Sequence, residues 1–320
     1  MIAWQTILCW ALMPLLFIAQ VNAQSNWTDK SPHKTDFITV NGVRLHYLDW
    51  GGKGDAILFL HGSGDTPHIY DDLAPNFTNQ FRALGLTRRG HGQSEQPVSG
   101  YDTATRVEDI RQFLDALKVP RAIVVGHSAA GGELTMLAGA HPDRVIKLVY
   151  LDAIFDIDPK FLEQIPAELF DIDMRSLDSA RRSLKPTKSN WSEALEASLR
   201  EQFSSDGMTY LNVETGRAVG AMIQGDARQD YTKIKSPALS FAVVGIHSNM
   251  ASQLKALPEE RRKIVDNFLS IFKHRQEKEI ERFHKELPTG RVVVFTNADH
   301  HCFIDKESEV VREMRVFLGK

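Results

Sequence analysis

The sequence predicts an α/β fold, in which a mostly parallel central sheet is flanked by helices. Short β-rich runs alternate along the chain with segments of helical periodicity, and this alternation is typical of parallel strands joined by crossover helices. The composition agrees with a globular protein, because 42% of the 320 residues are hydrophobic and 25% are charged. A chain of this length can bury a large core.

The predicted strands begin with a hairpin and continue as separate apolar runs. Asn41-Gly42 lies between the first two runs and is a strong hairpin signal. The predicted strands are Phe37–Val40, Arg44–Trp50, Ala56–Leu60, Phe81–Leu86, Ala122–Val125, Lys147–Leu151, Ala238–Val244 and Arg291–Thr296. The predicted helices of the same region are Thr103–Leu117, Gly131–Ala140, Pro258–Glu286 and Glu307–Leu318.

The alternation stops between Ala153 and Pro237. This stretch contains amphipathic helical segments, such as Trp191–Phe203, and no convincing strand. Because the strands on either side of it need the same sheet, we predict a helical cap inserted after the sixth strand rather than an independent second domain. The predicted core is therefore residues 24–152 together with 238–320, and the predicted cap is residues 153–237.

The first 23 residues have the features of an export signal. Met1–Ala23 contains no Lys, Arg, Asp or Glu, and its apolar run Ile7–Ile18 has the length of a signal-peptide core. We predict cleavage after Ala23 and a secreted or periplasmic protein; an uncleaved anchor is the alternative, which Pro14 disfavours. Cleavage removes one of the two cysteines and leaves Cys302, so no internal disulfide is expected.

Charge and spacing exclude several classes of function. The formal net charge of −3 gives no general attraction for nucleic acid. The sequence has no phosphate-cradling glycine loop and no His/Cys cluster with metal-ligand spacing. We therefore expect no cofactor and no metal, and a small-molecule partner without nucleic acid or a stable membrane span.

A serine lies at a sharp turn between a predicted strand and a predicted helix. In Gly126-His-Ser128-Ala-Ala130, small residues stand two before and two after the serine. A nucleophile held at such a turn has strained backbone angles, and the strand and helix that cross there require small neighbours. The usual G-x-S-x-G pattern has glycine where this chain has Ala130.

This motif resembles the nucleophile turn of the α/β-hydrolase superfamily, and the resemblance covers nearly all of the sequence after residue 23. His61–Gly64 looks like the oxyanion-hole loop of that family, and Arg88–Ser94 looks like its R-G-x-G-x-S loop. Asn297–His300 looks like the catalytic-histidine loop. The order serine, acid, histidine is the one that this fold uses.

The resemblance implies a role for each motif. Ser128 would be the nucleophile, and His300 would be the base that takes its proton and later protonates the leaving group. The backbone N–H groups of Ser63 and Ala129 would form the oxyanion hole.

The acid of the triad has two possible locations. The usual one, shortly after the seventh strand, gives Asn249 where a carboxylate is expected after Gly245. The other one, at the end of the sixth strand, gives Asp152, which we assign as the acid. The alternative is that Asp152 only caps the strand end, and that Asn249 or a cap residue orients His300.

Neighbouring residues receive structural interpretations. His301 adjoins His300, but the offset from the strand end favours His300 as the base. His91 and His127 are interpreted as structural hydrogen-bonding residues. We expect Glu133 to point elsewhere on its helix and to complement the helix dipole, and Cys302 to be a buried small hydrophobe.

Serine at this turn points to acyl-enzyme chemistry, because the epoxide hydrolases and haloalkane dehalogenases of this superfamily carry aspartate there. We therefore predict a serine hydrolase that cleaves a small or medium carboxylic ester or lactone. An acidic run at the start of the cap, from Ala153 to Asp178, leaves open an aminopeptidase of the proline-iminopeptidase type. A ligand-binding protein of this fold without turnover is the third possibility.

Overall fold

The computed structural model describes residues 27–156, 159–166, 173–184, 191–211, 228–245, 254 and 257–319. The predicted export signal, Met1–Ala23, lies outside the described residues. Within the described part of the chain, no helix combines the length and the apolar character that crossing a membrane requires.

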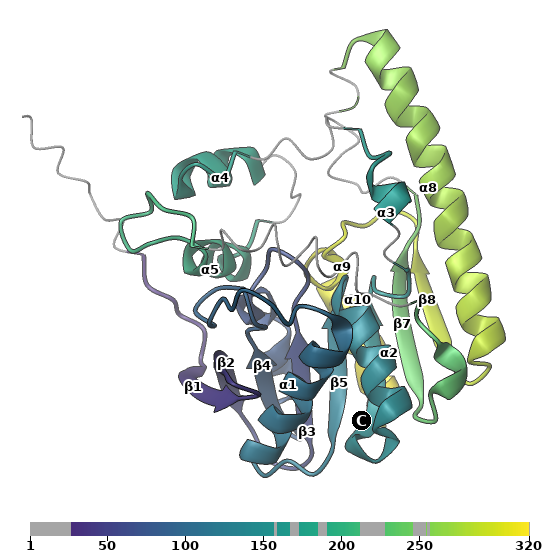
Figure 1. Ribbon diagram of the computed structural model, residues 1–320. Coiled ribbons are helices and arrows are strands. Elements are labelled where there is room, and N and C mark those ends of the chain that lie inside the picture. Colours follow the sequence, from purple (N-terminus) through teal and green to yellow (C-terminus); the bar gives the residue numbers. More distant parts are fainter. Residues whose placement is uncertain are drawn as a thin grey trace, which may run out of the picture.

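An eight-stranded sheet forms the centre of the molecule, in the order β1-β2-β4-β3-β5-β6-β7-β8 (Figure 1). The antiparallel pairs are β1–β2 and β2–β4, and all other neighbours are parallel. The strands are β1 Lys34–Val40, β2 Val43–Gly51, β3 Ala56–Leu60, β4 Arg82–Leu86, β5 Ala122–His127, β6 Val145–Leu151, β7 Ala238–Val243 and β8 Arg291–Phe295. The mostly parallel sheet of the predicted fold class is thereby confirmed.

The first two strands form the predicted hairpin. Asn41 and Gly42 connect them with φ angles of 49° and 75°. Both angles are left-handed, as a two-residue hairpin turn requires, and asparagine and glycine are the residues that adopt them most readily. Val40 then pairs with Val43 across the turn.

The central parallel strands bring two loops together at one edge of the sheet. Every residue of β3 and β5 is buried, which agrees with strands covered by helices on both faces. In the register of the sheet, His127 at the end of β5 lies opposite Leu151 at the end of β6. The residues that follow them, Ser128 and Asp152, therefore leave neighbouring strands at the same edge.

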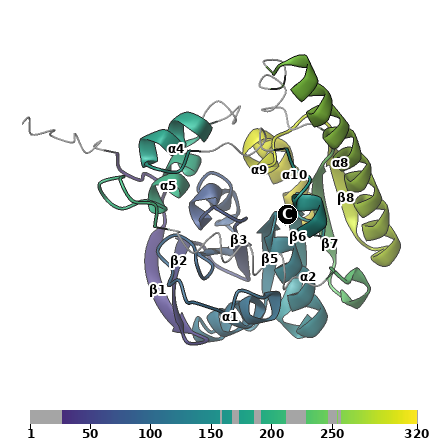
Figure 2. The same ribbon diagram turned by 45° about the horizontal axis from the view of Figure 1, so that its top comes forward.

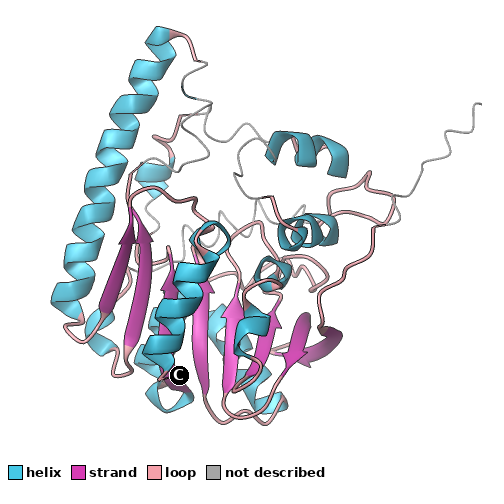
Figure 3. Cartoon of the chain, turned by 180° about the vertical axis from the view of Figure 1, so that it is seen from behind, coloured by secondary structure: helices cyan, strands magenta, loops and turns pink. Residues whose placement is uncertain are grey.

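Helices cover both faces of the sheet. Figure 1 shows α1 and α2 in front of the strands, and Figure 3, the view from behind, shows α10 on the opposite face. The long helix α8 runs beside β7 and β8 and extends past their carboxyl ends, and its Phe283 packs against Tyr150 and Tyr231. The ranges of these helices are α1 Thr103–Ala116, α2 Ala130–Ala140, α8 Glu259–Glu286, α9 Cys302–Asp305 and α10 Glu307–Leu318.

Between β6 and β7, the described residues form short helices. They are α3 Pro159–Leu162, α4 Leu177–Leu184, α5 Glu193–Glu201 and the 3-10 helix η6 Tyr231–Lys233. Figures 1 and 2 show α4 and α5 beyond the carboxyl ends of the strands. Much of residues 153–237 lies outside the described part of the chain, so the predicted bounds of the cap stay a prediction.

Further 3-10 turns connect the elements of the core. They are η1 Pro67–Tyr70, η2 Ala74–Phe77 and η3 Pro142–Arg144. The first of them, η1, follows the loop after β3, and its Thr66 N–H donates a hydrogen bond to Ser198 Oγ of α5 at 3.0 Å. The β3 loop is thus joined to a helix of the segment between β6 and β7.

Candidate active site

Ser128 lies at the turn between β5 and α2, as its sequence context predicts. Its φ angle is 53°. This left-handed value is unfavourable in free energy for any residue that has a Cβ atom. Hydrogen bonds hold the turn on both sides: the Ser128 N–H donates to Leu151 O at 3.2 Å, and the Gly131 N–H donates to Ser128 O at 3.0 Å. This is the strained strand–turn–helix geometry of a nucleophile elbow.

The small residues around Ser128 are required by close packing. A Cβ atom at Gly126 would lie 3.1 Å from the Cβ of Ala130 and 2.5 Å from a methyl carbon of Leu134. A Cβ atom at Gly62, in the loop after β3, would lie 3.1 Å from the Cβ of Ser128. The β3 loop therefore passes directly beside the serine.

Asp152 and His300 are hydrogen-bonded to one another. Asp152 follows β6 with a φ angle of 48°. One of its carboxylate oxygens, Oδ1, accepts the Val243 N–H at 2.9 Å, and the other, Oδ2, lies 2.7 Å from His300 Nδ1. When Nδ1–H donates this hydrogen bond to the carboxylate, the neutral form of the ring has its lone pair on Nε2.

The exposure of this pair suits a base that must meet a substrate. The side chain of Asp152 is 6% exposed and that of His300 is 27% exposed. A fixed, buried carboxylate behind a more accessible imidazole is the arrangement that orients a general base. Asn249, the alternative orienting residue, lies outside the described residues.

A second histidine and an aspartate hold the loop of His300. His127 Nε2 lies 3.2 Å from the carbonyl oxygen of His300, and His301 Nε2 lies 3.1 Å from Asp65 Oδ2. Burial, together with the electrostatic interaction with His300, lowers the pKa of His127 to about 3, so this ring is neutral and donates to the carbonyl. Burial alone would raise the pKa of Asp65, but the neighbouring His301 holds it well below its usual range.

Sequence reasoning missed Asp65, because it stands in the β3 loop, far along the chain from both histidines. Only the folded chain brings them together, with His127 Nδ1 3.7 Å from Asp65 Oδ2. His127 and His301 have structural contacts here, which agrees with the interpretation given to His127. The other such histidine, His91, places Nδ1 3.1 Å from the carbonyl oxygen of Arg89.

His61 joins the loops after β3 and β4. Its Nε2 accepts the Arg88 N–H at 3.0 Å, and its Nδ1 lies 2.8 Å from the Gly62 carbonyl oxygen. Burial, together with the charge of Arg88, lowers the pKa of His61 well below its usual range. A neutral ring with its proton on Nδ1 satisfies both contacts, so His61 fixes the backbone beside Gly62.

Glu133 lies in the first turn of α2, where a carboxylate complements the helix dipole as predicted. Its burial and its partners were not predicted: the side chain is fully buried, and one oxygen lies 3.0 Å from Arg88 Nη1 and 2.5 Å from Arg106 Nε. Burial alone would raise the pKa of Glu133, but the charges of the two arginines lower it. Glu133 is therefore a buried counter-ion that ties α2 to α1 and to the loop after β4.

The remaining predicted residues have the following positions. Ala129 is buried directly before α2, and helix N-termini leave backbone N–H groups without partners inside the helix. Ser63 is exposed in the β3 loop. Cys302 is fully buried, as expected of a small hydrophobe, and burial raises the pKa of its thiol well above the usual range.

Among the described residues, two groups of histidine and aspartate side chains have ligand atoms close enough together to bind one metal ion. One is Asp65, His127 and His301, and the other is Asp29, His33, His68 and Asp71. In each group the ligand atoms lie within 4.8 Å of one another. Their members come from separate segments, which is why spacing along the sequence did not indicate them.

Comparison with known proteins assigns the chain to a family. The family model for the alpha/beta hydrolase fold matches residues 55–212. Over 215 residues the chain is 30% identical to the non-heme chloroperoxidase CPO-A1 of Kitasatospora aureofaciens, a match that covers 63% of this chain and 77% of that protein. Over 139 residues it is 32% identical to the bifunctional esterase/perhydrolase DCH of Acinetobacter calcoaceticus, covering 42% and 50% of the two chains.

The chain spans about a third to a half of the length of several curated relatives that it matches. Among solved structures, the E-2-(acetamidomethylene)succinate hydrolase superposes with a TM-score of 0.67 at 18% identity, over 90% of this chain and all of that one. At this identity the likeness concerns the fold. Together with the strand order and the serine turn, these matches show that the chain belongs to the α/β-hydrolase family.

Proposed function

We propose that the protein is an exported serine hydrolase that cleaves a small or medium carboxylic ester or lactone through an acyl-enzyme on Ser128. One observation carries the proposal: His300, which lies 2.7 Å from Asp152, also has its ring centre 4.5 Å from that of His127, the residue directly before the strained turn of Ser128. A weak hydroxyl nucleophile needs an oriented base, and the contact with Asp152 orients one. The family relationship, which includes an esterase, supports the same chemistry.

The proposed reaction assigns a step to each residue. As Ser128 Oγ attacks the carbonyl carbon, His300 Nε2 takes the hydroxyl proton, and Asp152 stabilises the imidazolium. The N–H groups of Ser63 and Ala129 stabilise the oxyanion. The bond to the alkoxy oxygen then breaks, and His300 gives its proton to the departing alcohol. Water repeats the sequence and releases the carboxylic acid.

The aminopeptidase alternative needs cap carboxylates that bind a free amine. Of the seven acidic residues between Ala153 and Asp178, the structure describes four. Three of these already contact arginines: Asp156 with Arg282, Asp173 with Arg175 and Asp178 with Arg181. The described part of the acidic run therefore favours the ester over the amine-bearing substrate.

The substrate class can be tested by comparing two chromogenic compounds. We expect kcat/KM for p-nitrophenyl butyrate to exceed that for proline p-nitroanilide by about a hundredfold or more, because no amine-binding carboxylate is needed for the ester. A preference for the anilide would support the aminopeptidase. Turnover of neither compound would support a ligand-binding protein.

Export is tested by sequencing the N-terminus of the purified protein, which we expect to begin at Gln24 after cleavage of the signal.

A further inference from the structure

The segment that precedes β1 is held against the body of the protein. We call residues 27–33 the N-terminal strap. At its start, Trp27 Nε1 donates to Glu193 Oε2 of α5 at 2.9 Å, and the guanidinium carbon of Arg200 lies 4.8 Å from the centre of the Trp27 ring. At its other end, the strap meets η1, the turn after the β3 loop.

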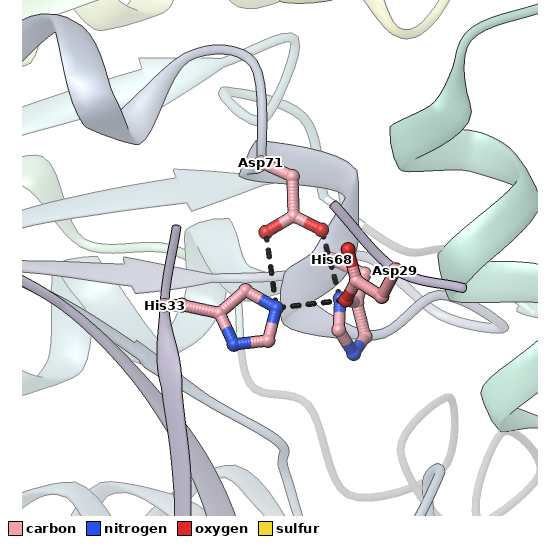
Figure 4. A group of neighbouring side chains, drawn as sticks. All are labelled: Asp29, His33, His68 and Asp71. Atoms are coloured by element: carbon pink, nitrogen blue, oxygen red, sulfur yellow. Dashed lines mark hydrogen bonds and ion pairs between the residues drawn. The ribbon is translucent and has the colours of Figure 1, made fainter. Parts of the chain in front are cut away.

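Four side chains converge where the strap meets η1. Figure 4 shows Asp29 and His33 of the strap facing His68 and Asp71 of η1 and its C-cap. His33 Nε2 lies 2.8 Å from Asp29 Oδ2 and 3.8 Å from Asp71 Oδ1. His68 Nδ1 lies 3.3 Å from Asp29 Oδ2 and 2.8 Å from Asp71 Oδ2.

These distances are close to those of a tetrahedral zinc site. Zinc bonds to histidine nitrogen and carboxylate oxygen are about 2.0–2.2 Å long, so neighbouring ligand atoms of a tetrahedron are separated by roughly 3.3–3.6 Å. The four His–Asp distances run from 2.8 to 3.8 Å, with both oxygens of Asp71 taking part, and one ligand atom from each residue lies within 4.8 Å of the others. Two imidazoles and two carboxylates are also a ligand set that suits zinc.

Outer contacts hold three of the four side chains in place, as they do around metal ligands. Trp50 Nε1 donates to Asp71 Oδ1 at 2.9 Å, and the Ser31 N–H donates to Asp29 Oδ1 at 2.9 Å. On the far side of the His68 ring, Nε2 lies 3.6 Å from Glu201 Oε2. A carboxylate behind a metal-binding histidine in this position orients the ring.

Charge and burial also call for a cation. The side chain of Asp71 is 5% exposed and that of Glu201 is 3% exposed, and Asp29 at 27% is the most accessible of the group. The three neighbouring carboxylates gather negative charge in a poorly solvated place, which is costly unless positive charge compensates it. A divalent cation at the centre would compensate two of them.

We propose that Asp29, His33, His68 and Asp71 bind one zinc ion, which fastens the N-terminal strap to η1. The site is separate from Ser128, Asp152 and His300, so the proposal does not depend on the proposed ester hydrolysis. The competing interpretation is a pair of hydrogen-bonded His–Asp contacts without a metal.

Zinc binding to the purified protein tests the proposal. The protein carries no polyhistidine tag, is stripped with a chelator and is then dialysed against Zn²⁺, after which bound zinc is measured by mass spectrometry. We expect the unchanged protein to bind one zinc ion per chain. The His33→Ala and Asp29→Asn variants should lose this ion, because their affinity for zinc should be at least about a hundredfold weaker. His274→Ala, which removes an exposed imidazole of α8, is the matched control and should bind zinc like the unchanged protein.

A second measurement separates loss of the site from loss of the fold. Zinc at a hundredfold excess over its Kd should raise the Tm by about 5 °C or more in the unchanged protein and in His274→Ala. Asp29→Asn keeps the size of the side chain at the most accessible of the four positions, so it should fold and show no such rise. Equal zinc binding in Asp29→Asn and the unchanged protein, or no stoichiometric zinc in either, would overturn the proposal.

Discussion

Replacing Ser128 with alanine is expected to lower kcat/KM for p-nitrophenyl butyrate by about 10⁴- to 10⁶-fold. Alanine removes the only atom that the proposed mechanism allows to form the acyl-enzyme, so the remaining rate comes from substrate binding and the oxyanion donors. Steady-state kinetics of the purified variant provide the measurement. Ser270→Ala, at an exposed position of α8, is the matched control and should keep the full rate.

The backbone of Ser128 allows a check that the loss is chemical. The φ of 53° at Ser128 strains the backbone of serine and would strain that of alanine equally, whereas glycine adopts this angle without strain. Ser128→Gly should therefore be as inactive as Ser128→Ala and unfold at an equal or higher temperature. A Ser128→Ala protein that still hydrolyses the ester at more than a tenth of the original rate would mean that Ser128 is not the nucleophile.

Replacing Asp152 with asparagine is expected to lower kcat by about 10⁴-fold. The asparagine oxygen can still accept the Val243 N–H, which leaves the amide NH₂ facing His300 Nδ1. Because that NH₂ can only donate, Nδ1 must become the acceptor and the proton moves to Nε2. His300 then has no lone pair with which to take the proton of Ser128.

The fold should survive this change, because asparagine tolerates the left-handed φ of 48° at this position. Thermal unfolding of Asp152→Asn checks this point, and Asp266→Asn on the exposed face of α8 is the matched control for the kinetics. A kcat within threefold of the original would show that Asp152 is not a member of the triad. Asn249 or a residue of the predicted cap would then be the candidate that orients His300.

Most of the fold could be predicted because its signals are local. The predicted strand Ala56–Leu60 has the bounds of β3, since an unbroken apolar run between polar residues is a property of five neighbours in sequence. The predicted strand Ala122–Val125 was too short, because β5 continues through Gly126 and His127, where glycine and histidine do not look like strand residues.

The meeting of His300 with Asp152 could be expected from topology. Both follow parallel strands, and the carboxyl ends of parallel strands share one edge of the sheet. The partners of Glu133 could not be expected in this way, because Arg88 and Arg106 belong to a loop and a helix whose side-chain directions no local pattern reveals. A buried glutamate in a helix looks like a surface glutamate until its counter-ions are placed.

The same reason explains why Asp65 and the four residues at η1 were missed. Asp29 and His33 are four positions apart, and His68 and Asp71 are three apart, but the two pairs are separated by more than thirty residues of hairpin and sheet. Each pair alone is a common surface pattern. The two pairs form one group only when the strap folds back across η1.

A fluorophosphonate probe tests whether Ser128 is the nucleophile that forms the acyl-enzyme. The protein is incubated with the probe and digested, and the adduct is located by peptide mass spectrometry, with Ser128→Ala treated in parallel. The proposed mechanism predicts one adduct per chain on Ser128, none in Ser128→Ala, and slow labelling of Asp152→Asn. An unlabelled Ser128 in folded protein, or an adduct on another residue, would contradict it.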